Sequence, residues 1–292
     1  YLKVVRRHAI NRLWDGLIPG PDFKHSSAEK TAGYIHSSKL VKFRPEAGDR
    51  YSPTAARVIR FCLVDDCWLN SLRMQVTLNK LTKNLADASI DLTPIAPAIA
   101  MFTSARLFLG GQVVEQIDEL GPLATIIEKT KPRARQLIDS MQTHPFDNTG
   151  TPTPVPSGGS RRLLFELPFG MFKQTRWLPL HILSQLVVEM TLAPATQAFV
   201  ETRASFILSD VALLGTCLHV DSSVTEVYNR HILADGKLPI PYQSVIGSRH
   251  IVNGSEFTLS LSRSLPMLKQ LYFVIVKTTR TLSQNIVRRW QR

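Results

Sequence analysis

The feature that most constrains the fold is a series of short segments in which apolar residues alternate with polar ones or form brief runs. In the sequence MQVTL, Met74, Val76 and Leu78 alternate with Gln75 and Thr77. A period of two predicts a strand that buries one face in an antiparallel sheet. On this basis we expect strands over residues 39–44, 57–63, 72–78, 105–109, 112–117, 161–167, 185–193, 205–220, 242–252, 256–262 and 270–276.

The segment 205–220 is long for one strand, and we expect either a single strand or two strands that meet near Ser209-Asp210. Nucleotide-binding α/β folds need strands that alternate regularly with helices, and this sequence lacks that pattern. Many short strands, few helices and long inserted loops predict a mainly β protein. The expected architecture is an antiparallel sandwich or jelly roll with a few short helices.

The pair Gly110-Gly111 lies between two apolar runs in ARLFLGGQVVEQI. It allows two interpretations: a hairpin turn, or a loop that brings the backbone close to a ligand. A dinucleotide-binding loop needs G-x-G-x-x-G at the start of a helix, and a phosphate-binding loop needs G-K-[ST]. Here the glycines precede the strand-like QVVEQI, so the sequence favours a hairpin in which glycine adopts positive φ.

Two segments have helical character. Residues 119–141 are a candidate, although two prolines interrupt the pattern. Residues 222–234 are a better candidate because their apolar residues share one face. Asp221 or Ser223 can cap the start of this helix, and Ser223 with Glu226 fits a capping box.

Three other segments organise the chain. Residues 144–160, HPFDNTGTPTPVPSGGS, contain four prolines and predict a long surface loop within the strand series. Residues 233–243 are the better candidate for a junction between domains. Asn253-Gly254 between two strand-like runs is the strongest short-range hairpin signal in the chain.

Composition limits the class of protein. The chain has 292 residues, 44% of them hydrophobic, which suffices for one large or two modest domains. No run of eighteen apolar residues occurs, so we expect no membrane-spanning helix. Three cysteines are too few for a disulfide scaffold and are typical of a protein from a reducing compartment.

The net charge of +12 is concentrated near the ends of the sequence. Residues 1–44 hold nine Lys and Arg against three acidic residues, and residues 263–292 hold seven against none. Basic segments on a neutral body indicate either contact with an acidic surface or simply solvated ends. The candidates for contact with nucleic acid or another acidic surface are Arg6, Arg7, Arg12, Arg288, Arg289 and Arg292.

Signals for a metal site are weak. Four residues separate Cys62 from Cys67, a spacing at the outer limit for zinc ligands, and no second pair accompanies them at finger spacing. Cys217 and His219 lie on one face of an expected strand, but isolated Cys and His residues are commonly structural. We therefore expect no metal and no cofactor.

Signals for catalysis are weaker still. The sequence contains no G-x-S-x-G and no H-E-x-x-H. Its carboxylate clusters, Asp65-Asp66 and Glu115 with Asp118 and Glu119, are expected to be turn residues and solvated strand ends. We assign no catalytic residue and expect that the protein is not an enzyme.

Four segments, taken in order along the chain, resemble the double-jelly-roll major capsid proteins of nucleocytoplasmic large DNA viruses and Polinton-like viruses. MFTSARLFLGGQVVEQID resembles the hairpin of the first roll. LLFELPFGMFKQTRWLPLHILSQLVVEMTLA resembles its later strands, with Phe169, Gly170 and Phe172 in a loop before LPL. DVALLGTCLHVDSSVTEVYNRHIL resembles the closing strand and connecting helix, and FTLSLSRSLPMLKQLYFVIVK resembles an early part of the second roll.

The resemblance implies four regions. These are a basic N-terminal arm (1–37), a first jelly roll (38–220), a connecting helix with the start of an incomplete second roll (221–277), and a basic tail (278–292). Family members continue through a full second roll, so a truncated or genome-integrated copy is expected, and the residues after Lys277 are not expected to form jelly-roll strands.

As a function, the resemblance implies a viral structural protein that self-assembles into trimeric, pseudo-hexagonal capsomers. Such a protein would lie in the virion capsid after assembly in the host cytoplasm or nucleus, and its partners would be itself and other capsid proteins. Two alternatives remain: a nucleic-acid-binding protein acting through its basic ends, and a carbohydrate- or ligand-binding β-sandwich. The four tryptophans are scattered along the sequence, which disfavours the second alternative.

Overall fold

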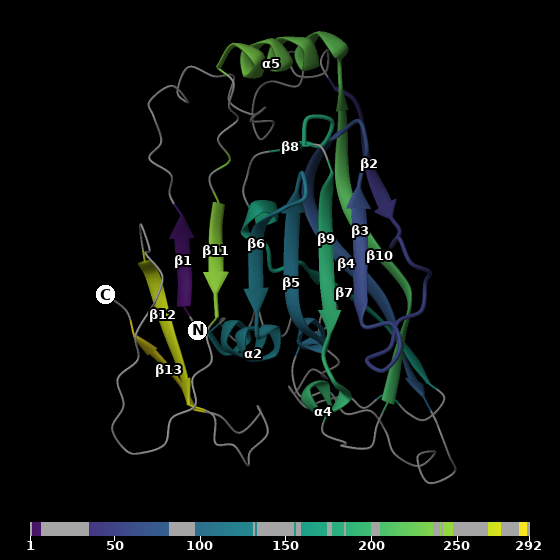
Figure 1. Ribbon diagram of the computed structural model, residues 1–292, viewed down its shortest axis with the longest axis vertical. Coiled ribbons are helices and arrows are strands. Elements are labelled where there is room, and N and C mark those ends of the chain that lie inside the picture. Colours follow the sequence, from purple (N-terminus) through teal and green to yellow (C-terminus); the bar gives the residue numbers. More distant parts are fainter. Residues whose placement is uncertain are drawn as a thin grey trace.

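The computed structural model describes residues 2–6, 35–81, 97–130, 132, 155, 159–173, 177–183, 185–199, 205–235, 240, 242–247, 268–275 and 286–290. Within this part of the chain, strands form three antiparallel sheets, and short helices lie at their ends (Figure 1). The fold is therefore mainly β, as the alternating pattern predicts.

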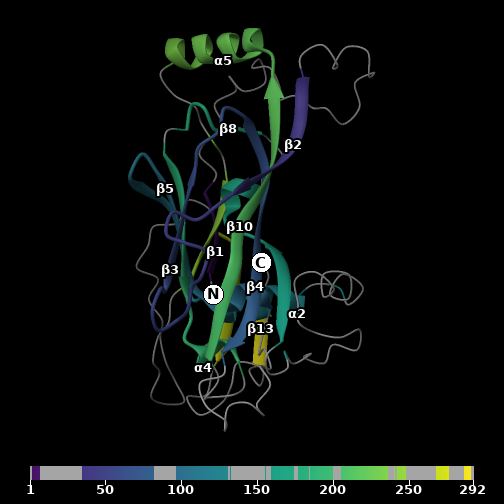
Figure 2. The same cartoon turned by 90° about the vertical axis from the view of Figure 1, so that its right-hand side faces the viewer.

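Two of the sheets face each other as a sandwich, which Figure 2 shows edge-on. The first sheet has the order β2-β10-β4-β7, and β8 adds to β4. Its strands are β2 (Ile35–Phe43), β4 (Trp68–Leu81), β7 (Ser160–Glu166), β8 (Leu178–Pro179) and β10 (Ser205–Val220). The second sheet has the order β3-β9-β5-β6. Its strands are β3 (Val58–Leu63), β5 (Phe102–Leu109), β6 (Gln112–Asp118) and β9 (Leu186–Leu192).

The strand order identifies a jelly roll. If β8 is set aside and the remaining eight sandwich strands are numbered along the chain, the two sheets have the orders 1-8-3-6 and 2-7-4-5. This arrangement of two interlocked Greek keys defines the fold. The expected jelly roll is confirmed for the strands from β2 to β10.

Alternating side chains fill the space between the two sheets. Ile59, Phe61 and Leu63 of β3 are at most 1% exposed, and Met74 and Val76 of β4 are fully buried. Burying each such side chain contributes about 1.5–3 kcal/mol. The period of two in MQVTL therefore reflects the inner face of a sheet, as predicted.

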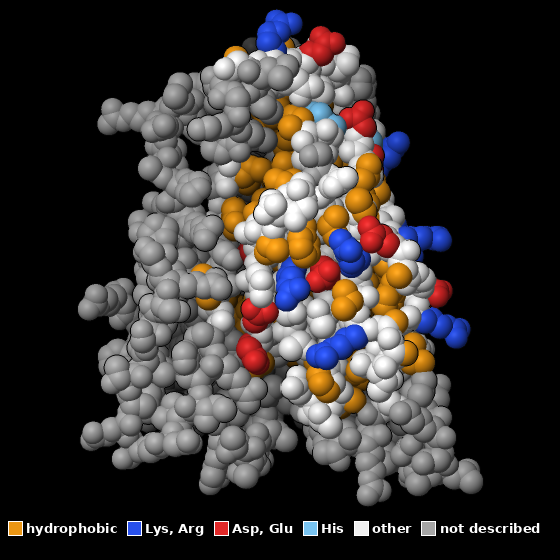
Figure 3. All heavy atoms as spheres, in the orientation of Figure 1, with side chains coloured by type: hydrophobic (Ala, Val, Ile, Leu, Met, Phe, Trp, Pro, Cys, Tyr) orange, Lys and Arg blue, Asp and Glu red, His pale blue; other side chains and the backbone are white. Residues whose placement is uncertain are grey.

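The outer face of the second sheet carries ion pairs. Glu189 of β9 lies between Arg60 of β3 and Arg106 of β5, with N–O distances of 3.7 and 3.6 Å. The strand register places both arginines directly opposite Glu189. Figure 3 shows this face of the molecule, with basic and acidic side chains next to each other among apolar ones.

Gly110 and Gly111 form the turn of the β5–β6 hairpin. Their φ values are +55° and +79°, a conformation that glycine adopts without steric cost. The register shifts just after the turn, because Phe108 pairs with Val113 and Leu107 pairs with Glu115. Val114 is thus an extra residue in β6, and this bulge sets which side chains of β6 point inward.

The two longest strands are irregular. The break expected near Ser209-Asp210 is a shift of register inside the continuous strand β10, and Asp210 has a φ of +49°. In β4, Ser71 has a φ of +37°, close to a second shift between Gly215 and Thr216 of β10. Such irregularities bend a strand and redirect its side chains.

A third sheet, with the order β11-β1-β12-β13, lies beside the roll (Figure 1). It consists of β1 (Leu2–Arg6), β11 (Tyr242–Ile246), β12 (Leu268–Ile275) and β13 (Ile286–Trp290). Strands β1 and β13 fall in the segments expected to be a basic arm and a basic tail, and β13 lies after Lys277 in this third sheet, outside the jelly roll formed by β2 to β10. Valine and isoleucine favour strands, and the neighbouring strands of the sheet provide backbone partners that sequence does not reveal.

Two longer helices flank the sheets. Helix α2 (Leu120–Thr130) ends before Pro132, because the residue preceding a proline disfavours helical geometry. Helix α5 (Ser222–Asp235) confirms the second predicted helix. Its cap is Asp221, whose Oδ1 accepts the N–H of Ser223 at 2.8 Å. The expected capping box from Ser223 is wrong, since Ser223 lies inside the first turn.

Shorter elements complete the described structure: 3₁₀-helices η3 (Ala98–Met101) and η4 (Gly170–Lys173), and helix α4 (Ala195–Ala198). In the long loop 144–160, Val155 is buried in the core, so this loop is not entirely superficial. The Asn253-Gly254 hairpin and the strand expected over 256–262 lie outside the described residues.

Candidate functional site

A group of potential metal ligands lies at the end of the roll nearest α5. Asp65 precedes β4, Cys67 adjoins it, and Cys217 lies near the end of β10. One carboxylate oxygen of Asp65 and the Sγ atoms of the two cysteines all lie within 4.8 Å of one another. Both cysteines are fully buried, and Asp65 is half-buried.

Backbone pairing brings these residues together. Cys217 pairs with Leu69 across the β4–β10 ladder, which places it beside the start of β4. The carbonyl of Cys67 accepts the N–H of Leu180 at 2.9 Å, which ties this turn to the segment after β8. The positions of Cys67 and Cys217 are thus fixed by sheet geometry.

The two thiols interact with each other. Their mutual hydrogen bond raises the pKa of Cys67 and lowers the pKa of Cys217, while burial opposes ionisation of both. Cys62 lies in the other sheet, opposite Val187, and does not join this group. The zinc-like spacing between Cys62 and Cys67 therefore does not reflect a shared site.

Two histidines lie nearby. His219 Nδ1 is 3.1 Å from the carbonyl oxygen of Asp66 and must donate to it, because a carbonyl only accepts. Burial lowers the pKa of His181, whose Nε2 is buried without a hydrogen-bond partner. The ring of Trp68 packs against the rings of His181 and of Tyr228 in α5, with centroid distances of 5.8 and 4.8 Å.

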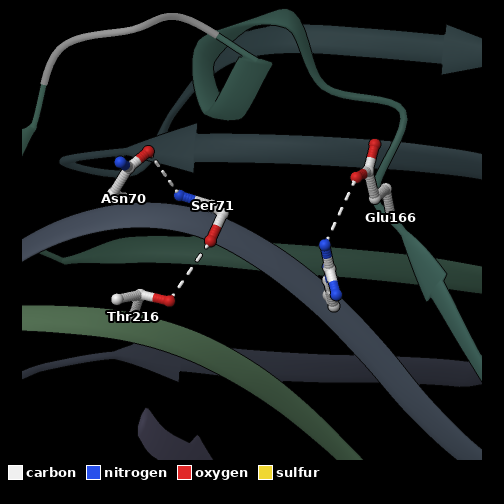
Figure 4. A network of polar contacts seen from close by, with 5 residues as sticks. Asn70, Ser71, Glu166 and Thr216 are labelled. Carbon is white, nitrogen blue, oxygen red and sulfur yellow. Dashed lines mark hydrogen bonds and ion pairs between the residues drawn. The ribbon is translucent and has the colours of Figure 1, made fainter. Parts of the chain in front are cut away.

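The outer face of the first sheet is hollowed around the irregular residue Ser71. Ser71 Oγ lies 3.4 Å from Thr216 Oγ1, and the N–H of Ser71 donates to Asn70 Oδ1 at 2.9 Å (Figure 4). One hollow of about 220 Å³ is lined by Leu40, Ser71, Arg73, Leu164, Leu214 and Thr216. A second, of about 340 Å³, lies between Ser71 and Lys173. Neither lining includes a histidine or cysteine.

A buried carboxylate connects the roll to β11. Glu115 is 2% exposed and accepts the N–H of Gly170 at 3.0 and 3.1 Å and that of Met171 at 3.5 Å. It also forms a hydrogen bond with the side chain of Ser244. Burial, the dominant cause, raises the pKa of Glu115.

Two further contacts hold β11 at this junction. Tyr242 Oη donates to the carbonyl of Val114 at 2.9 Å. A Cβ added to Gly170 would lie 1.6 Å from the backbone oxygen of Gln243, so the two backbones meet at a position where only glycine fits.

The expectation that Glu115 is a solvated strand end is wrong. The bulge at Val114 places Glu115 on the inner face of β6 with Ile117, and its partners lie far away in sequence. By contrast, Glu119 lies directly before α2 with a φ of +56°, a backbone conformation that occurs in turns. No local sequence pattern distinguishes these two carboxylates, because burial depends on distant segments.

The candidate arginines fall into two groups. Arg6 lies in β1, and Arg288 and Arg289 lie in β13 of the same sheet, with β12 between the two strands. The structure thus brings three residues from opposite ends of the sequence into one sheet. The other candidates, Arg7, Arg12 and Arg292, lie outside the described residues.

No protein-family model matches the sequence, and no curated protein matches it. Solved structures do resemble the fold. The PBCV-1 virus capsid has a TM-score of 0.45 and 13% identity over 69% of this chain and 46% of its own. The Faustovirus major capsid protein has a TM-score of 0.45 and 8% sequence identity, over 67% of this chain and 56% of its own. The Sputnik virophage structure has a TM-score of 0.40 and 10% sequence identity, over 70% of this chain and 52% of its own.

The chain therefore spans about half the length of the solved structures that it matches. The assignment of the jelly roll rests on the strand order of its two sheets. Among the described residues, no helix combines the length and the apolar character that crossing a bilayer requires.

Proposed function

We propose that this chain is a viral major capsid protein that acts by associating with other copies and other capsid proteins through its surfaces. The observation that carries the proposal is a complete eight-strand jelly roll that continues through α5 into β11, which is docked on the roll at Glu115. Jelly rolls serve as capsid, lectin and cupin domains. The order of the four capsid-like segments along the sequence favours the first of these uses.

In this proposal the strands from β2 to β10 form the first roll, and α5 leads to strands of a second roll. Three copies associate into a pseudo-hexagonal capsomer, alone or with other capsid proteins, in a virion assembled in the host cytoplasm or nucleus.

Strand edges favour self-association in this proposal. Among the described residues, the third sheet ends in β13 on the side opposite the docked strand β11, and β2 and β7 are the edge strands of the first sheet. A strand edge presents unpaired backbone donors and acceptors to a partner strand. We therefore expect the isolated chain to associate or to be poorly soluble without a partner.

Negative-stain electron microscopy of the full chain tests the proposal. Purified protein at high concentration is expected to show compact particles with three-fold symmetry and a pseudo-hexagonal outline. Fields that contain only single-chain particles at every concentration would overturn trimer formation.

We also propose that the basic ends contact an acidic surface, either the genome or an inner membrane. This is favoured by the location of Arg6, Arg288 and Arg289 in one sheet. Replacing all six candidate arginines with glutamine should weaken binding to DNA of any sequence and flatten its salt dependence. If the unmodified chain binds neither DNA nor anionic vesicles at low salt, this proposal fails.

A further inference from the structure

We propose that Asp65, Cys67 and Cys217 form a binding site for a zinc-type divalent cation. Each residue offers one ligand atom, and the three atoms lie within 4.8 Å of one another. Two thiolates and a carboxylate are ligands that Zn²⁺ accepts in proteins. The site lies apart from the Glu115 junction and from both hollows of the first sheet.

The spacing suits a single tetrahedral ion. Zinc lies about 2.3 Å from sulfur and about 2.0–2.2 Å from oxygen, so neighbouring ligand atoms of one ion are roughly 3.5–4 Å apart. The observed limit of 4.8 Å means that small side-chain movements suffice to reach this geometry. Three protein ligands leave the fourth position for water, as in zinc sites that keep one position open.

The surroundings hold the ligands in place. Cys217 lies in the β4–β10 ladder, and the Cys67 carbonyl accepts the N–H of Leu180. Asp65 is half-buried whereas both cysteines are fully buried, so the carboxylate is the ligand nearest to solvent. A ligand set fixed by the surrounding fold is what a metal site requires.

His219 strengthens the argument without being a ligand in this structure. Its Nδ1 donates to the carbonyl of Asp66, the neighbour of Asp65, which in the neutral ring leaves Nε2 as an acceptor. Histidines that bind metals commonly make this kind of hydrogen bond through the other ring nitrogen. A bound ion would connect the turn before β4 to the end of β10, directly before α5.

Cobalt titration of the full chain, purified under reducing conditions and monitored by absorption, tests the site. We expect one Co²⁺ per chain with a thiolate-to-cobalt charge-transfer band, and displacement of the cobalt by Zn²⁺. Cys67→Ser and Cys217→Ser should abolish the band, whereas Cys62→Ser should leave it unchanged because Cys62 lies in the other sheet.

A comparison of two aspartate variants tests the site even if the cysteine variants misfold. Asp65→Asn should weaken cobalt binding at least about tenfold, whereas Asp66→Asn should not. The proposal is overturned if the unmodified chain shows no charge-transfer band. It is also overturned if Asp65→Asn binds as tightly as Asp66→Asn, or if mass spectrometry finds a Cys67–Cys217 disulfide in protein purified under reducing conditions.

Discussion

The carboxylate of Glu115 and the backbone N–H of Gly170 form the hydrogen bond that fastens the loop after β7 to the hairpin strand β6. Both carboxylate oxygens lie within 3.1 Å of that nitrogen, and Glu115 also bonds the side chain of Ser244 in β11. One buried acidic side chain therefore joins three segments, and it lies where the chain continues from the roll into the third sheet.

Replacing Glu115 should separate the effect of its hydrogen bonds from that of its charge. Glu115→Ala leaves the N–H of Gly170 without its partner and creates a cavity, so it should lower the free energy of unfolding by on the order of 2–4 kcal/mol. Glu115→Gln keeps an acceptor of the same size and should cost less than about 1 kcal/mol near neutral pH. Denaturant unfolding measures the free energy of unfolding of both variants. Equal losses of stability in Glu115→Ala and Glu115→Gln would contradict the role of the hydrogen bonds.

Stability should also depend on pH through Glu115. Burial raises its pKa above the usual 4.5, so the folded chain binds more protons than the unfolded chain between that value and the raised pKa. The stabilising contribution is therefore full below pH 4.5 and is lost as pH rises through the folded-state pKa. Unfolding free energies of the unmodified chain, measured relative to Glu115→Gln, should fall over this range. A difference that does not vary with pH would contradict the prediction.

The close contact between Gly170 and Gln243 predicts intolerance of any side chain at position 170. In Gly170→Ala the new Cβ would overlap the backbone oxygen of Gln243, so β11 must shift, at an expected cost of at least about 3 kcal/mol. Gly48→Ala is the matched control. Gly48 has a φ of +69° but open space around it, so this change should cost only about 1–2 kcal/mol of backbone strain. Equal unfolding free energies for the two variants would refute the contact.

The cap of α5 gives a simpler test. Asp221→Ala removes the acceptor for the N–H of Ser223 and should lower stability by about 0.5–2 kcal/mol. Ser223→Ala should change stability by less than about 0.5 kcal/mol, since Ser223 is an exposed residue within the first turn. Thermal unfolding followed by circular dichroism distinguishes Asp221 from Ser223 as the capping residue. A larger loss of stability from Ser223→Ala than from Asp221→Ala would contradict the cap at Asp221 and favour the capping box of Ser223 with Glu226.

The strands of the roll were predictable from sequence because each one has its own signal. The alternation around Met74 and the Gly110-Gly111 turn are local, and period two or positive φ needs no knowledge of distant residues. The same holds for the break at Asp210, which the structure shows as a shift of register within β10.

The sites were not predictable in this way. Glu115 is buried by a bulge and by partners from two distant segments, so its own sequence context is that of an exposed strand end. Cys67 and Cys217 are 150 positions apart and meet only through the β4–β10 register. Strand β1 pairs with β11 and β12 near the other end of the sequence, which charge and composition do not indicate.

The most direct test of the central claim is the mass of the full chain in solution, measured by size-exclusion chromatography with multi-angle light scattering. A capsid building block is predicted to elute with a mass of three times 32.7 kDa, or to require a capsid partner to remain soluble. A stable, monodisperse species of 32.7 kDa across the accessible concentration range would contradict the account.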